Sequence, residues 1–374
     1  MIPSSRFLLL ILLLITAGIA ASPMAMASDL QQRIDDLVTL QMQKQNIPGV
    51  AVGVFIAGEP ILMKGYGFAN VEHRAPVTPA SVFHSASIGK QFTAVAIMLL
   101  VEDGALGLDS SIRTYYPDAP TSWQPITIRH LLTHTSGIAD YFDAMGANGI
   151  DAYDSRHDYA PEELRRIFYT LPLEFEAGAN FSYSNTGYAL LGFLIHEVSG
   201  RFYGDVLRDR VFTPLGMPSA AVVSESDIVP GRVAGYELVD GELKNEEWYA
   251  PTNNTADGAL YLSLLDYQAW NRALRERAVL SDASWTEVYT PVRLNDGRQY
   301  PYGLGWNISE SQRAPWYHHS GGWLGFRLFI SRYLANDLTI VVLSNLDLAE
   351  PAIIVDGIAE IIDPGIAKLL PGAE

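Results

Sequence analysis

A serine and a lysine three positions apart are the first residues whose types and spacing suggest covalent chemistry. The chain has five lysines, and Lys90 alone has a serine three residues before it, in Ser87-Ile88-Gly89-Lys90. In a helical turn this spacing places both side chains on one face, where a deprotonated lysine can accept the proton of the hydroxyl. The alternative is a serine that caps a helix beside an exposed lysine. A thiol nucleophile is excluded because the chain has no cysteine.

Two further motifs have side chains suited to the same chemistry. Tyr183-Ser184-Asn185 is the one Tyr-x-Asn of the sequence. Its tyrosine can hold a proton near a lysine, and its amide can orient both the lysine and a substrate carbonyl. His319-Ser320-Gly321-Gly322 lies on a predicted strand, where glycines admit a substrate and expose a main-chain N–H to an oxyanion. A surface turn is the alternative for the Tyr-x-Asn motif.

A metal centre is not expected. His318 and His319 are adjacent, but neighbouring residues of a strand point to opposite faces of the sheet and cannot chelate one ion. Zinc-thiolate and iron-sulfur sites need cysteine. We therefore predict no metal and no other cofactor.

The elements that must position these motifs alternate between strand-rich ends and a helical centre. Helices are predicted over Asp29–Gln45, Ser87–Val101 and Ala352–Ile362, and strands over Val50–Ala57, Ile61–Phe68, Tyr302–Ser309, Trp316–His319, Phe326–Tyr333 and Leu338–Leu343. Residues 105 to about 290 show helical patterns interrupted by Pro and Gly loops. The prediction is an α/β lobe of about 28–86 and 300–374 with an inserted, mostly helical lobe of about 87–299.

The N-terminus has the pattern of a signal peptide over residues 1–27. Arg6 precedes an apolar run over Phe7–Ala21, and Ala25-Met26-Ala27 offers small residues at a cleavage site. We predict an exported protein, periplasmic or extracellular, with a mature chain of 28–374. An uncleaved membrane anchor is the alternative, although Gly18 and Pro23 interrupt a run that would need about 20 apolar residues. No second run is long enough to span a membrane.

The charge of the chain limits its partners. Forty-two acidic residues outnumber 25 basic ones, which gives a formal net charge of −17. Such a surface repels phosphate backbones, and no local run of Lys and Arg compensates. We expect a small-molecule or peptide substrate and no nucleic acid. The sequence does not predict an oligomeric state.

The order Ser-x-x-Lys, Tyr-x-Asn and His-Ser-Gly resembles the serine β-lactamase and penicillin-binding-protein superfamily. The resemblance is strongest to its branch of class C β-lactamases, D-alanyl-D-alanine carboxypeptidases and esterases. It extends over nearly the whole mature chain, through Gly65–Asn70, Phe83–Ser87, Ile128–Gly137, Tyr183–Leu191, Pro214–Met217, Tyr302–Trp306 and His319–Phe326. It implies an antiparallel sheet flanked by helices, a β-lactamase/transpeptidase-like fold, with the reactive serine where the helical lobe joins.

The resemblance also implies roles for the motif residues. Ser87 is then the acyl-accepting nucleophile, and Lys90 and Tyr183 share the general base and acid steps, in an order that the sequence leaves open. Asn185 contacts the substrate amide, with His319 and Gly321 beside the substrate. The backbone N–H groups of Ser87 and Gly322 form the oxyanion hole.

One departure bears on the substrate. His319 stands where many β-lactamases and peptidases have a lysine, so a permanent cation facing a substrate carboxylate is absent. Efficient hydrolysis of β-lactams is therefore not expected, but the sequence leaves the scissile bond open among an ester, a D-amino-acid peptide, an amide and a lactam. A penicillin-recognising protein that is acylated with little turnover is the alternative function.

Other residues near the motifs have structural interpretations. His134 is assigned to packing rather than to catalysis. Four aromatic residues are candidates for the pocket lining or, equally, for the core or rim: Tyr141, Trp248, Tyr249 and Trp323.

Overall fold

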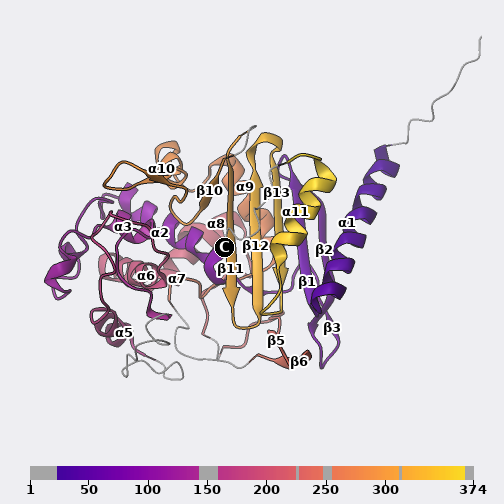
Figure 1. Cartoon of the computed structure of the whole chain (residues 1–374), viewed down its shortest axis with the longest axis horizontal. Coiled ribbons are helices and arrows are strands. Elements are labelled where there is room, and N and C mark those ends of the chain that lie inside the picture. The colour runs from indigo at the N-terminus through magenta and orange to yellow at the C-terminus, as the bar shows by residue number, and fades with distance from the viewer. Residues whose placement is uncertain (1–22, 143–158, 225–226, 247–254, 311–313, 367–374) are drawn as a thin grey trace, which may run out of the picture.

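The computed structural model describes residues 23–142, 159–224, 227–246, 255–310 and 314–366, with the side chains of 23–27 excepted. Its centre is a seven-stranded sheet of order β10-β11-β12-β13-β1-β2-β3, in which every pair is antiparallel (Figure 1). The strands are β1 (Gly49–Ile56), β2 (Glu59–Asn70), β3 (Ala75–Pro76), β10 (Asn307–Ser309), β11 (Trp316–Trp323), β12 (Phe326–Tyr333) and β13 (Leu338–Ser344). Because β1 pairs with β13, strands from the two ends of the chain meet at the centre of the sheet.

Each face of the sheet packs against its own layer of helices. Helix α1 (Pro23–Gln45) and helix α11 (Pro351–Ile362) cover one face, whereas α9 (Leu264–Glu276) packs on the other. Strand β1 shows the alternation that this requires, because Val50 and Val52 join the core under α1 and α11 while Ala51 joins the core shared with the central helices.

The block between the strand-rich ends contains most of the remaining helices, on the left of Figure 1. They are α2 (Lys90–Glu102), α3 (Ile128–Leu132), α5 (Pro161–Phe168), α6 (Asn185–Ser199), α7 (Tyr203–Leu207), α8 (Thr213–Leu215) and α10 (Asp282–Val288), with short helical turns η1 (Ala86–Gly89), η2 (Ile112–Thr114), η3 (Thr121–Trp123) and η4 (Arg208–Phe212); η5 (Leu334–Asn336) lies between β12 and β13.

This block is less purely helical than the sequence predicts. It also contains parts of three two-stranded sheets: β4 (Phe83–His84) with β7 (Tyr261–Leu262), β5 (Tyr236–Val239) with β6 (Glu242–Asn245), and β8 (Val292–Arg293) with β9 (Gln299–Tyr300). The β5–β6 hairpin turns at Asp240-Gly241, both with positive φ. Asp-Gly is a common sequence for such a turn, so this hairpin has a signal that the prediction missed.

Several predicted boundaries differ from the structure, and among them the strand expected over Trp316–His319, which is β11, continues to Trp323. The helix expected over Ser87–Val101 is a 3₁₀ turn, η1, followed by α2. The strand expected over Tyr302–Ser309 begins at Asn307, since the preceding residues bend at Gly305, which has a φ of 75°. Helix α1 begins at Pro23, six residues earlier than predicted.

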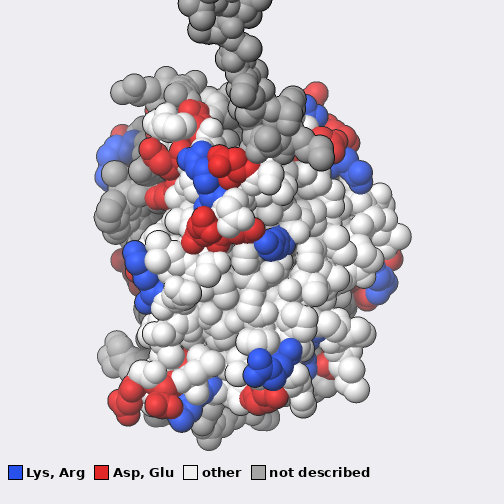
Figure 2. All heavy atoms as spheres, turned by 90° about the vertical axis from the view of Figure 1, so that its right-hand side faces the viewer, with Lys and Arg blue, Asp and Glu red and all other residues white. Residues whose placement is uncertain are grey.

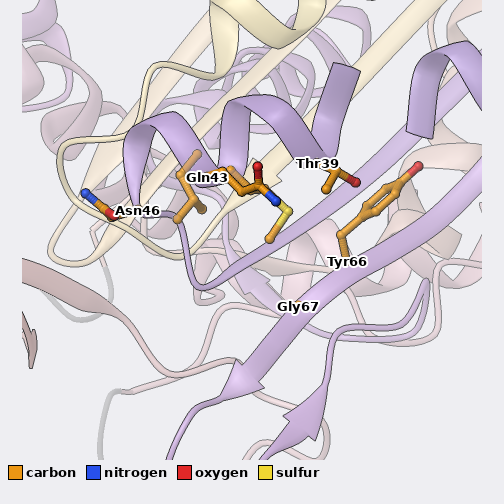
Figure 3. A pocket seen from close by; sticks show the side chains of 7 residues that line it. Thr39, Gln43, Asn46, Tyr66 and Gly67 are labelled. Atoms are coloured by element: carbon orange, nitrogen blue, oxygen red, sulfur yellow. The ribbon is translucent and has the colours of Figure 1, made fainter. Parts of the chain in front are cut away.

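The side of the molecule on which α1 lies carries small mixed groups of acidic and basic side chains around a largely uncharged area (Figure 2). Lys64 of β2 pairs there with Asp35 of α1 at 2.7 Å. A surface pocket of about 500 Å³ lies between α1 and β2 (Figure 3), and no predicted site residue lines it. Its lining residues are Thr39, Met42, Gln43, Asn46, Ile47, Tyr66 and Gly67. Among the described residues, no helix has the length and apolar character needed to cross a membrane.

Candidate active site

The turn that carries Ser87 is held tightly against strand β11. Ala86 has a φ of 48°, a strained value for a residue other than glycine, and its backbone N–H donates to His84 Nδ1 at 3.1 Å. A Cβ on Gly321 would lie 2.8 Å from the Ser85 carbonyl oxygen, so glycine permits this close approach. Ala86 is buried while Ser87 stays partly exposed at the junction of sheet and helical block. Strain directly before a partly exposed serine is typical of a functional turn.

Lys90 is fully buried, and its ammonium group lies beside the Ser87 hydroxyl. Nζ donates to Ser87 Oγ at 3.2 Å, to Asn185 Oδ1 at 2.7 Å and to the Asp257 carbonyl oxygen at 2.6 Å. A 3₁₀ turn has three residues per turn, so it aligns Ser87 and Lys90 as closely as the predicted α-helix would. Because Lys90 is buried, the alternative interpretation of an exposed lysine beside a capping serine is wrong.

Burial makes Lys90 a much weaker base than an ordinary lysine. It lowers the pKa of the ammonium to about 8, although the carboxylates of Asp257 and Asp140 act in the opposite direction. A group with this pKa exchanges protons near neutral pH, as a general base must.

Tyr183 lies against Lys90. Lys90 Nζ is 4.9 Å from the centroid of the Tyr183 ring. Tyr183 Oη is buried and has no hydrogen-bond partner in the described part of the chain. Burial raises the pKa of Tyr183 well above its ordinary value, while the nearby Ser87 hydroxyl acts in the opposite direction. Tyr183 is therefore a neutral phenol at neutral pH, which suits it to donate a proton rather than to remove one.

Asn185 begins helix α6, and two carboxylates from distant segments lie around it and Lys90. Asp140 Oδ2 accepts from the Asn185 backbone N–H at 2.6 Å and from Nδ2 at 2.8 Å. Asp257 offers its backbone oxygen to Lys90, and its carboxylate Oδ2 accepts from Tyr141 Oη at 2.9 Å. Both carboxylates are buried. The sequence analysis missed them, since neither belongs to a short motif and each lies far along the chain from its partners.

A hydrogen-bonded chain of buried rings lies behind Tyr183. His134 stacks on the Tyr183 ring with centroids 4.1 Å apart, and its Nδ1 accepts from the Ser184 backbone N–H at 3.0 Å. Because Nδ1 accepts, the neutral ring donates from Nε2, which lies 3.2 Å from Tyr302 Oη. Tyr302 in turn donates to His319 Nε2 at 3.0 Å. His134 is thus buried as predicted, but it also contacts a predicted catalytic side chain.

His319 lies buried on β11, with both ring nitrogens hydrogen-bonded within the protein. Its Nε2 is occupied by Tyr302, its Nδ1 donates to the Ser320 carbonyl oxygen at 2.6 Å, and the residue is 2% exposed. Burial lowers the pKa of His319 to about 3, so it stays neutral at neutral pH. Both ring nitrogens already have partners in the protein, and the place of His319 beside a substrate stays a prediction.

Arg327, a cation on the neighbouring strand β12, already has a partner of opposite charge. Gly322 lies opposite Arg327 in the β11–β12 register, and Gly321 lies opposite Leu328. Arg327 pairs with Asp347 at 2.8 Å, which partly neutralises its charge. The oxyanion role of the Ser87 and Gly322 N–H groups stays a prediction.

Of the four candidate pocket aromatics, two lie in the described chain. Tyr141 is 1% exposed and belongs to the core. Trp323 is partly exposed and stacks on His84 with centroids 5.4 Å apart, near the turn that carries Ser87. Trp248 and Tyr249 lie outside the described residues.

The described side chains contain no group of three His, Cys, Asp or Glu that could hold a metal ion. His318 lies near Phe329, on the face opposite the His319 chain, and its Nε2 contacts Ser309 Oγ at 2.9 Å. The two adjacent histidines thus point to opposite faces, as the strand geometry predicts.

Fold and site together define a class of protein. The family model described as Beta-lactamase matches residues 34–359. The chain belongs to the beta-lactamase family. Its antiparallel sheet with flanking helices confirms the predicted fold class, and the family match confirms the resemblance drawn from the motifs.

Two individual relatives are similar in sequence to most of this chain. The chain is 31% identical over 304 residues to Penicillin-binding protein 4* of Bacillus subtilis strain 168, covering 77% of this chain and 66% of that protein. It is 30% identical over 331 residues to the D-aminopeptidase of Gluconobacter oxydans strain 621H, covering 86% of this chain and 60% of that protein. The chain therefore spans less than two thirds of the length of both relatives.

A solved structure has the same fold. The octameric penicillin-binding protein homologue from Pyrococcus abyssi superimposes with a TM-score of 0.76 and 28% identity, covering 89% of this chain and 77% of that one. The family match and this superposition agree on the fold, and the proteins to which the chain is similar include penicillin-binding proteins and a D-aminopeptidase.

Proposed function

We propose that this protein is a serine hydrolase that forms an acyl-enzyme on Ser87 and cleaves an ester or amide bond. The observation that carries the proposal is the buried Lys90 ammonium 3.2 Å from Ser87 Oγ, with a pKa lowered to about 8. Two oxygen acceptors hold the lysine there. A serine and a lysine arranged in this way are an activated nucleophile and its base.

The reaction proceeds in two halves. Neutral Lys90 takes the proton of Ser87 while Oγ bonds to the substrate carbonyl carbon, and the intermediate collapses as the leaving alcohol or amine takes a proton. Tyr183, a neutral phenol next to both groups, supplies that proton and regains one from Lys90. A water molecule then attacks the acyl carbonyl carbon and loses a proton to the same pair. The bond between that carbon and Ser87 Oγ breaks, the pair returns the proton to Oγ, and the acid is released.

The substrates that this site favours are short esters and D-amino-acid amides or peptides rather than penicillins. The buried, neutral His319 supplies no cation for a substrate carboxylate, and Arg327 is paired with Asp347. A charge-assisted hydrogen bond is worth roughly 1.5–3 kcal/mol, so its absence costs anionic substrates about 10- to 100-fold in kcat/KM. The D-aminopeptidase relative supports the D-amino-acid class.

A substrate panel tests this proposal. We expect kcat/KM on p-nitrophenyl acetate or D-alanine p-nitroanilide to exceed that on a penicillin or a chromogenic cephalosporin by at least about tenfold in the same buffer. A penicillin turned over faster than the best ester would contradict the substrate class. A stoichiometric burst without steady turnover on any compound would favour the penicillin-recognising binder instead.

We also propose that the protein is exported. The motivation is the apolar run over Phe7–Ala21 followed by Ala25-Met26-Ala27. N-terminal sequencing of exported material should begin at Ser28. Met1 on membrane-bound protein would support the uncleaved anchor.

A further inference from the structure

The three hydrogen-bond partners of Lys90 Nζ differ in what they can do. The Asp257 carbonyl oxygen and Asn185 Oδ1 can only accept, whereas Ser87 Oγ can also donate. A neutral lysine amine has two hydrogens and one lone pair in a tetrahedral arrangement. If the two acceptors take the two hydrogens, the lone pair is left to face the hydroxyl of Ser87. The orientation of the Lys90 amine as a base thus depends on the Asn185 amide presenting its oxygen.

An asparagine amide is nearly symmetric in shape, so its environment must select which end faces the lysine. The opposite orientation would turn Nδ2 toward Lys90, and the neutral amine would then aim its lone pair at that N–H instead of at Ser87. Asp140 prevents this exchange. Its Oδ2 accepts from Asn185 Nδ2 at 2.8 Å, and a carboxylate offers no hydrogen to Oδ1.

Asp140 is itself held in one position. The residue is 8% exposed, Oδ2 also accepts from the Asn185 backbone N–H at 2.6 Å, and Oδ1 accepts from the Phe142 backbone N–H at 2.8 Å. Each carboxylate oxygen thus has at least one backbone donor. Since Asn185 begins α6, the carboxylate fixes both the backbone and the side chain of the residue that contacts Lys90.

We propose that Asp140 is a positioning residue that sets the orientation of the Asn185 amide and, through it, directs the Lys90 lone pair to Ser87. This role rests on the proposed function. It gives Asp140, which lies outside the three motifs, a part in the acylation rate that acts entirely through Asn185.

A competing explanation is that Asp140 acts only through its charge. Lys90 is surrounded by Asp140, Asp257, His134, His319 and the rings of Tyr183 and Tyr188, and both carboxylates raise its pKa. Asp257 is the natural comparison, because its carboxylate contacts Tyr141 and not Asn185 within the described residues. Replacing either aspartate by asparagine removes one negative charge near Lys90. The two roles therefore predict different results for variants that alter charge and hydrogen bonding separately.

The test measures the rate at which a fluorophosphonate phosphonylates Ser87, at a pH above about 8, where the neutral form of Lys90 predominates in the native protein. In this step Ser87 Oγ bonds to phosphorus, fluoride leaves and Lys90 takes the serine proton, so no natural substrate is needed. We expect Asp140→Ala to lower the rate constant by about 100-fold, the scale of a misplaced catalytic group. Asp140→Asn should lose an intermediate amount, because its amide oxygen can still accept from Asn185 while its NH₂ group, turned to the Phe142 backbone N–H, cannot accept from it.

Two comparisons distinguish an effect of Asp140 on the orientation of Asn185 from an effect of its charge and from a loss of folding. In a protein that already carries Asn185→Ala, adding Asp140→Ala should lower the rate constant by less than about a further threefold, because the two residues act as one unit. Asp257→Asn should keep the plateau rate and shift the pH profile to lower pH, because losing its charge lowers the Lys90 pKa. Should Asp140→Ala fail to fold, Asp140→Leu fills the space without accepting a hydrogen bond.

Either of two results would overturn the proposal. An Asp140→Ala variant that keeps the plateau rate and only shifts the pH profile to lower pH, as expected for Asp257→Asn, would assign the effect to charge. An undiminished loss in the Asn185→Ala background would assign it to something other than Asn185. A wild-type protein that does not react with the fluorophosphonate at Ser87 at all would overturn the proposed function, and this role of Asp140 with it.

Discussion

Lys90→Ala is expected to lower kcat by about 10² or more, because a positioned general base typically contributes 10²- to 10⁴-fold. The change removes the group that lies 3.2 Å from Ser87 Oγ and leaves the nucleophile in place. Steady-state kinetics on the best ester of the panel measure the loss. Lys64→Ala is the matched control, since Lys64 is an exposed lysine paired with Asp35 and should leave kcat unchanged.

The pH dependence of the wild-type protein tests the same role. With the pKa of Lys90 lowered to about 8, the neutral base becomes more abundant as the pH rises. The value of kcat/KM should therefore increase with pH and level off above about 8. A profile that is flat through this range, or a Lys90→Ala variant with near-normal turnover, would place the proton path elsewhere.

Tyr183→Phe is expected to lower kcat by about 10² while the fold stays intact, because the phenol proton serves the leaving group and little packing is lost. Tyr188→Phe provides a matched control. Its ring also lies near Lys90 Nζ, at 5.4 Å, but its hydroxyl donates to the Leu132 carbonyl oxygen at 2.7 Å. That control should lose about 1 kcal/mol of stability and little activity.

Equal losses of kcat in the two tyrosine variants would contradict a specific role for the Tyr183 hydroxyl. Thermal unfolding of both variants separates loss of activity from loss of stability, because a lowered melting temperature would reveal damage to packing. We expect the melting temperature to fall more in Tyr188→Phe, whose hydroxyl has a buried backbone partner.

Local patterns in the sequence were enough to find the side chains that meet at Lys90 Nζ. Ser87 and Lys90 are joined by one helical turn, and Asn185 stands two residues from Tyr183, so short motifs contain the groups that meet at Lys90 Nζ. The alternation of apolar residues likewise predicted most strands of the sheet. Both signals depend on residues within one element, where spacing in sequence fixes spacing in the fold.

The surroundings of the site could not be predicted in this way. Asp140 and Asp257 reach Asn185 and Lys90 from segments 45 and 167 residues away, and no local pattern reports such contacts. His319 was expected to face a substrate, but its partner Tyr302 comes from the loop before β10. Tertiary packing decides which side of a histidine stays free, and that packing buries both nitrogens of His319.

The account depends most on Ser87 as the nucleophile, and one measurement tests it directly. The full chain is treated with a fluorophosphonate, digested and analysed by mass spectrometry beside Ser87→Ala. We expect one adduct, on the peptide that contains Ser87, because among the described residues this hydroxyl alone combines a strained turn with a neighbouring lysine of lowered pKa. The adduct should be absent from Ser87→Ala. An adduct that persists in Ser87→Ala, or that forms on another residue of the wild-type protein, would contradict the account.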